Sequence, residues 1–157
     1  MKKIQYLLLY SGIICVAFII SYRYFQLMMI LGDSMSPTLN NMQIVLLDKT
    51  KLVYQENDII ASKCAELDSV IVKRVVACPG DVIVIKNGRL LVNNSESNFY
   101  NHTFFEYAGI LNDEIVLGEY EYFVIGDNAA QSIDSRYETV GIIKYDDILG
   151  KVVIHEK

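Results

Sequence analysis

The pattern of apolar positions changes near residue 30. From residue 4 to residue 22 (IQYLLLYSGIICVAFIISY) the apolar residues form one run without a charged side chain, whereas beyond residue 30 they occur in short runs. A helix of roughly 19 residues is close to the ~30 Å thickness of the hydrocarbon core of a bilayer. Residues 4–22 are therefore predicted to be a transmembrane helix.

Two other interpretations of this run are weaker. A buried core helix would carry polar residues on one face, which the run lacks. A cleavable secretory signal would begin in the same way, with Lys2 and Lys3 before the apolar run, but a small-x-small cleavage site would follow it. The residues from the end of the run onward, SYRYFQLMM (residues 21–29), contain no such site. We therefore expect a retained single-span anchor.

The charges beside the anchor predict its orientation. Lys2 and Lys3 precede the apolar run and Arg23 follows it. The positive-inside tendency keeps the two lysines in the cytoplasm. Residues 1–3 are thus expected to be cytoplasmic, residues 23–31 to form a juxtamembrane connection, and residues 32–157 to form an extracytoplasmic domain on a cell membrane.

The short apolar runs after residue 30 are typical of β-strands. They are rich in Val, Ile and Tyr, and no convincing amphipathic helix lies among them, which predicts an all-β domain of mainly antiparallel sheets. Asn87-Gly88 between two of these runs is a strong hairpin signal. Residues 93–118 are more polar and aromatic and are expected to form a looser insertion. The runs are residues 43–47, 58–62, 69–77, 81–85, 89–92, 120–125 and 151–155.

Composition and charge exclude several classes of protein. The chain has 157 residues, of which 52% are apolar, and its formal net charge is −5. From Asp33 onward it carries 11 basic and 19 acidic side chains, a net charge of −8. Because an acidic domain does not attract phosphate backbones, nucleic-acid binding is not expected.

Metal-binding patterns are absent from the sequence. It contains no C-x-x-C, no H-E-x-x-H and no clustered His, so we expect no metal and no cofactor. Cys64 and Cys78 bracket residues 69–77, and separate buried thiols are favoured over a disulfide between them. His102 and His155 are distant in sequence from any promising Ser or Cys, so nothing local favours a Ser-His-Asp triad.

Three segments contain side chains that folding alone explains poorly. The first is GDSMSPTL (residues 32–39). Gly32 permits close backbone approach and Pro37 stiffens the loop, so a serine between them could expose its hydroxyl and turn its own N–H toward an oxyanion. The simpler interpretation is an ordinary turn, with Ser34 or Ser36 as a cap.

The second segment is SVIVKRVVA (residues 69–77). In a strand, Lys73 and Arg74 point to opposite faces, so one of them must lie on the more apolar side if only one face is solvated. Burial lowers the pKa of a lysine and can make it a general base. The simpler interpretation is a lysine that extends from a sheet edge into solvent.

The third segment is GDNAAQSIDSR (residues 126–136), which follows a predicted strand. Asp134 and Arg136 are expected to form an ion pair that orders this loop, with Arg74 as a further candidate member. Ser132 carries a short hydroxyl that can orient an amine. A solvated turn with incidental charges is the simpler interpretation.

Together the three segments resemble the type I signal peptidases. The family patterns G-x-S-M-x-P-T, K-R-x-x-x-x-P-G-D and G-D-N-x-x-x-S-x-D-S-R all occur here, in the family's order and behind an N-terminal anchor. The resemblance covers nearly the whole chain except residues 93–118. It implies the all-β fold shared by signal peptidases and SOS-repressor proteases, and the lysine at position 73 is that of the bacterial or organellar branch.

The resemblance also implies roles for particular residues. Ser34 would be the nucleophile and Lys73 its neutral general base, with Ser132 holding the lysine. The backbone N–H of Ser34 would stabilise the oxyanion, and Gly32 stands where some relatives have an assisting serine, so a main-chain or water donor would replace that hydroxyl. The other implied residues are Arg74, Asp127, Asp134 and Arg136 as structural support, and Met35, Leu39, Ile71 and Val72 as pocket residues.

The implied activity is the removal of signal peptides from exported preproteins at the outer membrane surface, after small-x-small sites. Ser34 lies only about 12 residues past the anchor, a reach of roughly 40 Å, which keeps it near the membrane. Preproteins and the lipid bilayer are the expected partners.

Two departures from the family pattern concern substrate preference. Ala129 stands where the third pattern usually has arginine, and YETV (residues 137–140) makes the segment before Gly141 about two residues longer than is common. Neither departure removes a catalytic group. Other functions remain open: another Ser-Lys peptidase, such as a conjugative-transfer or pilus-specific processing peptidase, or a membrane-anchored β-domain that binds peptides without cleaving them.

Overall fold

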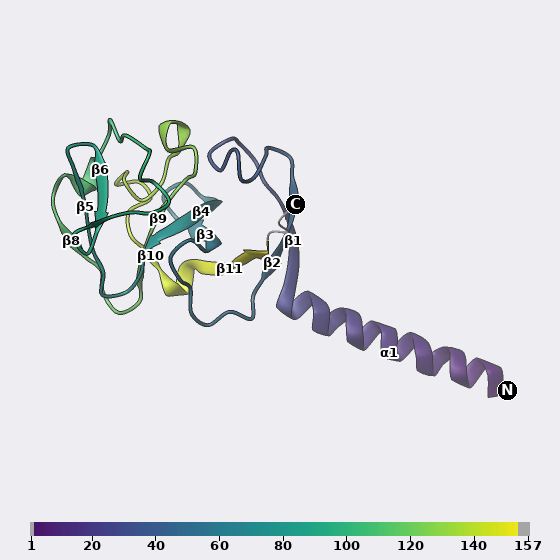
Figure 1. Ribbon diagram of the computed structural model, residues 1–157. Coiled ribbons are helices and arrows are strands. Elements are labelled where there is room, and N and C mark those ends of the chain that lie inside the picture. Colours follow the sequence, from purple (N-terminus) through teal and green to yellow (C-terminus); the bar gives the residue numbers. More distant parts are fainter. Residues whose placement is uncertain (1, 154–157) are drawn as a thin grey trace.

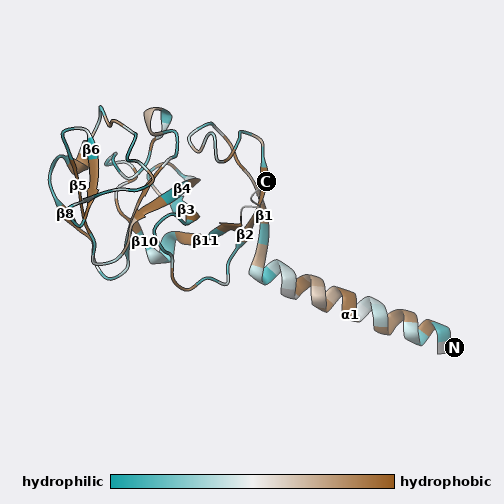
Figure 2. Cartoon of the chain, viewed as in Figure 1, coloured by the Kyte–Doolittle hydropathy of each residue, from teal (hydrophilic) through white to brown (hydrophobic). Residues whose placement is uncertain are grey.

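A long N-terminal helix extends away from a β domain in the computed structural model, which describes residues 2–153 (Figure 1). Helix α1 spans Lys2–Tyr24, and the apolar window within it is 0% buried against protein. Hydrophobic turns run along the helix with no other element packed on them (Figure 2). By length and composition, α1 can cross a membrane.

The larger of two antiparallel sheets has seven strands. Their order is β1-β2-β11-β3-β4-β9-β10, so the strand nearest the C-terminus lies between two early strands. The predicted connection over residues 23–31 instead contains the end of α1 and an edge strand. The strands are β1 (Phe25–Met29), β2 (Ile44–Asp48), β3 (Ile59–Cys64), β4 (Ser69–Ala77), β9 (Glu121–Ile125), β10 (Ile143–Lys144) and β11 (Ile148–Val153).

The smaller sheet has four strands in the order β7-β6-β5-β8. Its centre is the predicted hairpin, in which Asn87 and Gly88 both have positive φ, as a tight turn between twisted strands requires. A Cβ on residue 88 would lie only 2.2 Å from the Phe104 ring, so the glycine also permits close packing. The strands are β5 (Val82–Lys86), β6 (Arg89–Val92), β7 (Ser95–Glu96) and β8 (Ile115–Val116).

Residues 93–118 are more integrated than a loose insertion. They supply β7, β8 and the 3₁₀ turn η1 (Gly109–Asn112). Four of their side chains are buried in a cluster with β5 and β9: Tyr100, Phe105, Leu111 and Leu117. The segment therefore completes the hydrophobic core between the two sheets.

The predicted strands agree well with the observed ones. The bounds of β4 coincide with the predicted run, and β2, β3, β5, β6 and β9 lie within one or two residues of theirs. β11 begins earlier than predicted, at Ile148, while Ile154 and His155 lie outside the described residues. β1 and the short strands β7, β8 and β10 were not predicted from the sequence.

The two cysteines of the β domain are free thiols. The Cys64 Sγ lies 3.4 Å from the Thr139 carbonyl oxygen, and the Cys78 Sγ lies 3.8 Å from that of Tyr54. Burial raises the pKa of the Cys78 thiol to about 11. Cys78 therefore behaves as a packing side chain at neutral pH, and Cys64 is buried among its neighbours.

Candidate active site

Ser34 and Lys73 are 39 positions apart in the sequence, yet their side chains are in contact. The Lys73 Nζ donates a hydrogen bond of 2.6 Å to the Ser34 Oγ. Ser34 lies in the loop between β1 and β2, and Lys73 is the middle residue of β4. Met35 and Leu39 anchor that loop, because both are buried in a cluster with β2 and β3.

Lys73 lies in a site that disfavours its charged form. The residue is only 5% exposed, and burial lowers the pKa of its amine below the ordinary value of 10.5. The charges of Asp134 and Asp127 oppose this shift, but burial is the larger cause. No ion-pair partner of Lys73 occurs among residues 2–153. A neutral amine beside a serine hydroxyl can accept its proton.

Arg74, the next residue on β4, is also buried, but it is fully paired. Its guanidinium makes two hydrogen bonds to the Asp127 carboxylate, of 2.7 and 2.6 Å, and a third of 2.8 Å to the Asn57 carbonyl. The Phe99 ring, from the segment 93–118, covers it at 3.9 Å from the guanidinium carbon to the ring centroid. Arg74 is thus a structural cation.

The second ion pair lies within the third segment, as expected. Arg136 donates hydrogen bonds of 2.8 and 2.9 Å to the two oxygens of Asp134. Arg74 does not join this pair, because its guanidinium is engaged by Asp127 instead. Each carboxylate whose charge acts on Lys73 therefore has its own arginine, which leaves the lysine without a counter-ion.

Ser132 and Gly126 pack against the backbone of the loop between β1 and β2, which contains Ser34. The Ser132 Oγ is buried and has no hydrogen-bond partner among the described residues, so it does not bond Lys73 here. A Cβ on residue 126 would lie 2.3 Å from that Oγ and 2.5 Å from the Ser34 carbonyl oxygen. Only glycine at this position allows Ser132 to lie so close to Ser34.

The third segment, residues 126–136, also holds the backbone of the loop that contains Ser34. The Asn128 N–H donates to the Ser34 carbonyl at 3.0 Å, and its side-chain amide donates to the Asp33 carbonyl at 3.3 Å. The Ser34 N–H makes no hydrogen bond within residues 2–153, so it is available to an oxyanion. The Gly32 N–H, in contrast, donates to the Asn41 Oδ1 at 3.0 Å.

A cleft of about 570 Å³ leads to Ser34 and Lys73. One wall is the end of β1 with the residues after it, Met28–Leu31, and the other is the first half of β4, Ser69–Lys73. β9 pairs with β4 only from Arg74 onward, so this half of β4 has a free edge. The cleft can therefore accept an extended peptide as an added strand.

The predicted pocket residues divide into two groups. Met35, Ile71 and Val72 line the cleft. Leu39 is fully buried under the loop that contains Ser34, and it does not line the cleft. The wall formed by Met28–Leu31 was missed by the sequence analysis. The sequence gives no signal for it, because FQLMM does not alternate polar and apolar residues and follows the apolar anchor directly.

A serine hydroxyl in contact with a buried lysine, on a fold of antiparallel sheets, is suited to covalent catalysis by a hydrolase. Comparison with known proteins agrees with this class. The profile of the family "Signal peptidase, peptidase S26" matches residues 3–155. The chain therefore belongs to the signal peptidase family, and it is a serine peptidase.

Individual relatives give the same result. Signal peptidase I U of Bacillus subtilis (strain 168) is 31% identical over 161 residues, which cover 95% of this chain and 86% of that protein. Signal peptidase I P of Bacillus subtilis subsp. natto is 32% identical over 148 residues, covering 87% and 79%. These matches confirm the resemblance drawn from the three segments.

The fold has a counterpart among solved structures. A crystal structure of a signal peptidase I from Enterococcus faecalis V583 superposes with a TM-score of 0.52 at 24% identity, covering 64% of this chain and 97% of that one. The predicted fold class, antiparallel sheets behind one N-terminal apolar helix, is confirmed. No group of three or more His, Cys, Asp or Glu within residues 2–153 is arranged to hold a metal ion.

Proposed function

We propose that this peptidase removes signal peptides from exported preproteins with a catalytic dyad of Ser34 and Lys73. The observation that carries the proposal is the 2.6 Å contact between the Lys73 Nζ and the Ser34 Oγ, at a lysine whose pKa is lowered by burial. Membership of the signal peptidase family supports the substrate class.

The proposed reaction begins when the neutral Lys73 amine takes the hydroxyl proton of Ser34. The Ser34 Oγ then attacks the scissile carbonyl carbon, and the resulting oxyanion faces the Ser34 N–H. Lys73 gives its proton to the leaving amine, which departs and leaves an acyl-enzyme. A water molecule that gives a proton to Lys73 then attacks the ester carbonyl, and Lys73 returns that proton to the Ser34 Oγ as the acid product leaves.

In this mechanism Ser132 supports the lysine, whereas Gly32 has no catalytic role. The buried Ser132 hydroxyl, without a partner in the described residues, is available to bond the Lys73 amine once a substrate occupies the cleft. Gly32 does not contribute its N–H to the oxyanion, since that group bonds Asn41. A water molecule is the remaining candidate for the second oxyanion donor.

Substrate selection follows from the shape of the cleft. A signal peptide in extended form would pair with the free edge of β4 and place alternate side chains against the cleft walls. Met35, Ile71 and Val72 are bulky wall residues, so small side chains at the first and third positions before the cut fit best. This supports cleavage after small-x-small sites.

The membrane placement is part of the proposal. Helix α1 would span the bilayer with Lys2 and Lys3 in the cytoplasm and the β domain outside. β1 continues directly from α1, and its exposed Leu27 and Met29 pair with the exposed Leu46 and Ile44 of β2. This apolar face would lie against the lipid surface and hold the cleft at the height of a signal-peptide cleavage site.

The test is cleavage of a preprotein with an Ala-x-Ala site by the full-length protein in detergent. We expect Ser34→Ala and Lys73→Ala to lower the rate by at least about 10²–10⁴-fold, the usual contribution of a positioned acid–base group. Lys63→Ala, at an exposed lysine of β3, is the matched control. Wild-type activity in Lys73→Ala would refute the dyad, and an inactive wild-type protein would favour a peptide-binding domain.

A further inference from the structure

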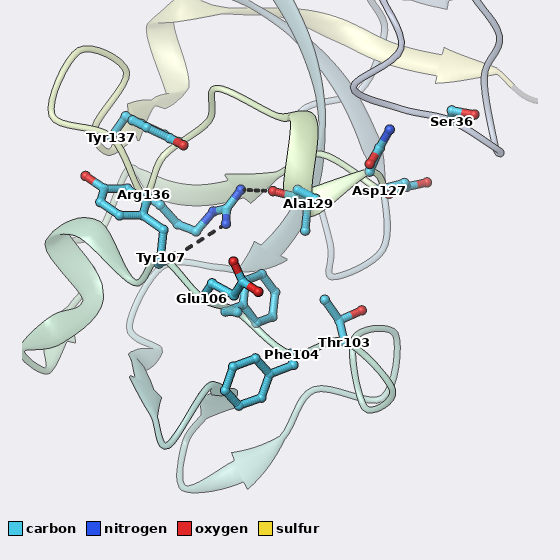
Figure 3. Close-up of a pocket in the computed structure, with 12 residues that line it drawn as sticks. Ser36, Thr103, Phe104, Glu106, Tyr107, Asp127, Ala129, Arg136 and Tyr137 are labelled. Atoms are coloured by element: carbon cyan, nitrogen blue, oxygen red, sulfur yellow. Dashed lines mark hydrogen bonds between the residues drawn. The ribbon is translucent and has the colours of Figure 1, made fainter.

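A second cavity, of about 470 Å³, is lined in part by a residue two positions after the proposed nucleophile, Ser34 (Figure 3). Ser36 forms part of its wall, and it shares no lining residue with the cleft that leads to Ser34 and Lys73. Asn128, whose N–H holds the Ser34 carbonyl, is another wall residue. The rest of the lining comes from residues 103–107, residues 127–130, Arg136 and Tyr137.

The only charge in this cavity without an ion pair, among the described residues, is the carboxylate of Glu106. Asp127 is tied to Arg74, and Arg136 is tied to Asp134. Glu106 is exposed, and Figure 3 shows it among Thr103, Phe104 and Tyr107, with its carboxylate turned toward the pocket. A carboxylate beside aromatic rings is a favourable environment for a cationic side chain.

The small side chain at position 129 leaves room beside Glu106. Ala129 lines the cavity and carries no charge. An arginine there would place a cation within the pocket that contains Glu106. With alanine, the pocket is open and the carboxylate is left for a ligand.

We propose that this cavity binds a lysine or arginine side chain of the preprotein, within the first few residues after the cleavage site. The inference rests on the proposed function. In the proposed complex the segment before the cut fills the cleft of β1 and β4, so the segment after it must leave Ser34 by another path. Ser36, two residues past Ser34, and Asn128, which bonds the Ser34 carbonyl, both line this cavity. Each extended residue advances the chain by ~3.3 Å, so a nearby pocket meets only a few positions.

The test uses the full-length protein and a set of preproteins that differ at one residue. A lysine is moved through positions one to five after an Ala-x-Ala cut, with serine and glutamate at the same positions for comparison. We expect lysine at one position, or at two positions of the same strand face, to raise kcat/KM by about tenfold over serine, chiefly through KM. Glutamate there should lower it, and added salt should reduce both effects.

Two variants assign the preference to the cavity. Glu106→Gln and Ala129→Arg should each bring the lysine-to-serine ratio of kcat/KM to about one. Glu119→Gln, at an exposed carboxylate outside the cavity, should keep the wild-type ratio. The ratio is measured within each variant, so a general loss of stability does not imitate the result.

The outcomes separate this inference from the proposed function. Equal cleavage of all lysine and serine substrates, or a preference that survives in Glu106→Gln, would overturn the inference and leave the peptidase activity intact. Failure of the wild-type protein to cleave any preprotein would refute the proposed function itself.

Discussion

Lys73 and Arg74 are adjacent buried basic residues on β4 with opposite surroundings. On the proposed dyad side, formed by Ser34, Lys73 and Ser132, the lysine amine contacts a hydroxyl and has no counter-ion. On the ion-pair side, formed by Arg74, Asp127, Asp134 and Arg136, each carboxylate has its own arginine. The two arginines therefore pair with the same carboxylates whose charges act on Lys73, in addition to ordering the loop.

The physical reason lies in the competition between burial and nearby charge. A carboxylate close to a lysine raises its pKa, and Asp134 and Asp127 act in that direction here. Burial is nevertheless the larger cause, and each of these carboxylates is paired with an arginine. A structural cation must be one that stays charged when buried, and arginine does so where lysine does not.

The largest expected effect is on the free energy of unfolding, and it distinguishes Arg74 from Lys73. Arg74→Met leaves the Asp127 carboxylate buried and unpaired, since that side chain is 2% exposed, and should lower the free energy of unfolding by about 3–5 kcal/mol. Lys73→Met removes no ion pair and should leave it unchanged or higher. Denaturant unfolding of the full-length protein in detergent measures both.

A second substitution and a control sharpen this result. Adding Asp127→Asn to Arg74→Met removes the unpaired charge and should recover a large part of the loss. Lys86→Met breaks an exposed contact of 3.8 Å with Glu114 and should cost no more than about 1 kcal/mol. Equal losses in Lys73→Met and Arg74→Met would show that the two cations have the same role.

The next effect concerns the close packing of Gly126 against Ser132 and Ser34, on the dyad side. Gly126→Ala would put a Cβ 2.3 Å from the Ser132 Oγ and 2.5 Å from the Ser34 carbonyl. The loop that contains Ser34 must then shift, and a displacement of about 1 Å can lower the rate roughly 10²-fold. Single-turnover cleavage measures the loss. Gly12→Ala, on the open surface of α1, is the control, and full activity in Gly126→Ala would mean that this close packing is not needed.

Much of this arrangement could be predicted from the sequence. Lys73 and Arg74 were assigned to opposite faces of one strand by simple alternation, and the bounds of β4 agree with the structure. Asn87-Gly88 identified its hairpin because both residues tolerate positive φ. The three segments were recognised as one site only through their resemblance to a family, since periodicity alone gave each of them an ordinary alternative.

Other features depend on contacts that no local pattern encodes. The pairing of Arg74 with Asp127, 53 positions away, could not be distinguished from pairing with Asp134. β1 continues the apolar anchor without a turn signal, so a strand that forms one wall of the cleft was taken for a connection. Leu39 was assigned to the pocket by resemblance, but it packs under the loop, because the depth of a side chain is set by the tertiary fold.

The smallest effect tests the charge of Lys73 through the pH dependence of stability. The folded-state pKa of Lys73 lies below its unfolded value of about 10.5, so the unfolded chain binds more protons between these two pKa values. Stability contributed by this residue should therefore rise with pH in that window, by up to about 1.4 kcal/mol per pH unit. Lys73→Met lacks this contribution, and the other titrating groups cancel in the difference between the two proteins.

The measurement is the free energy of unfolding of the wild-type protein and Lys73→Met at matched pH values up to about 10.5. We expect the variant to be favoured at neutral pH and the difference to shrink as the pH rises. A constant difference would mean that Lys73 titrates alike in the folded and unfolded chain. The dyad side would then hold a charged lysine, and the contrast with Arg74 would be one of pairing alone.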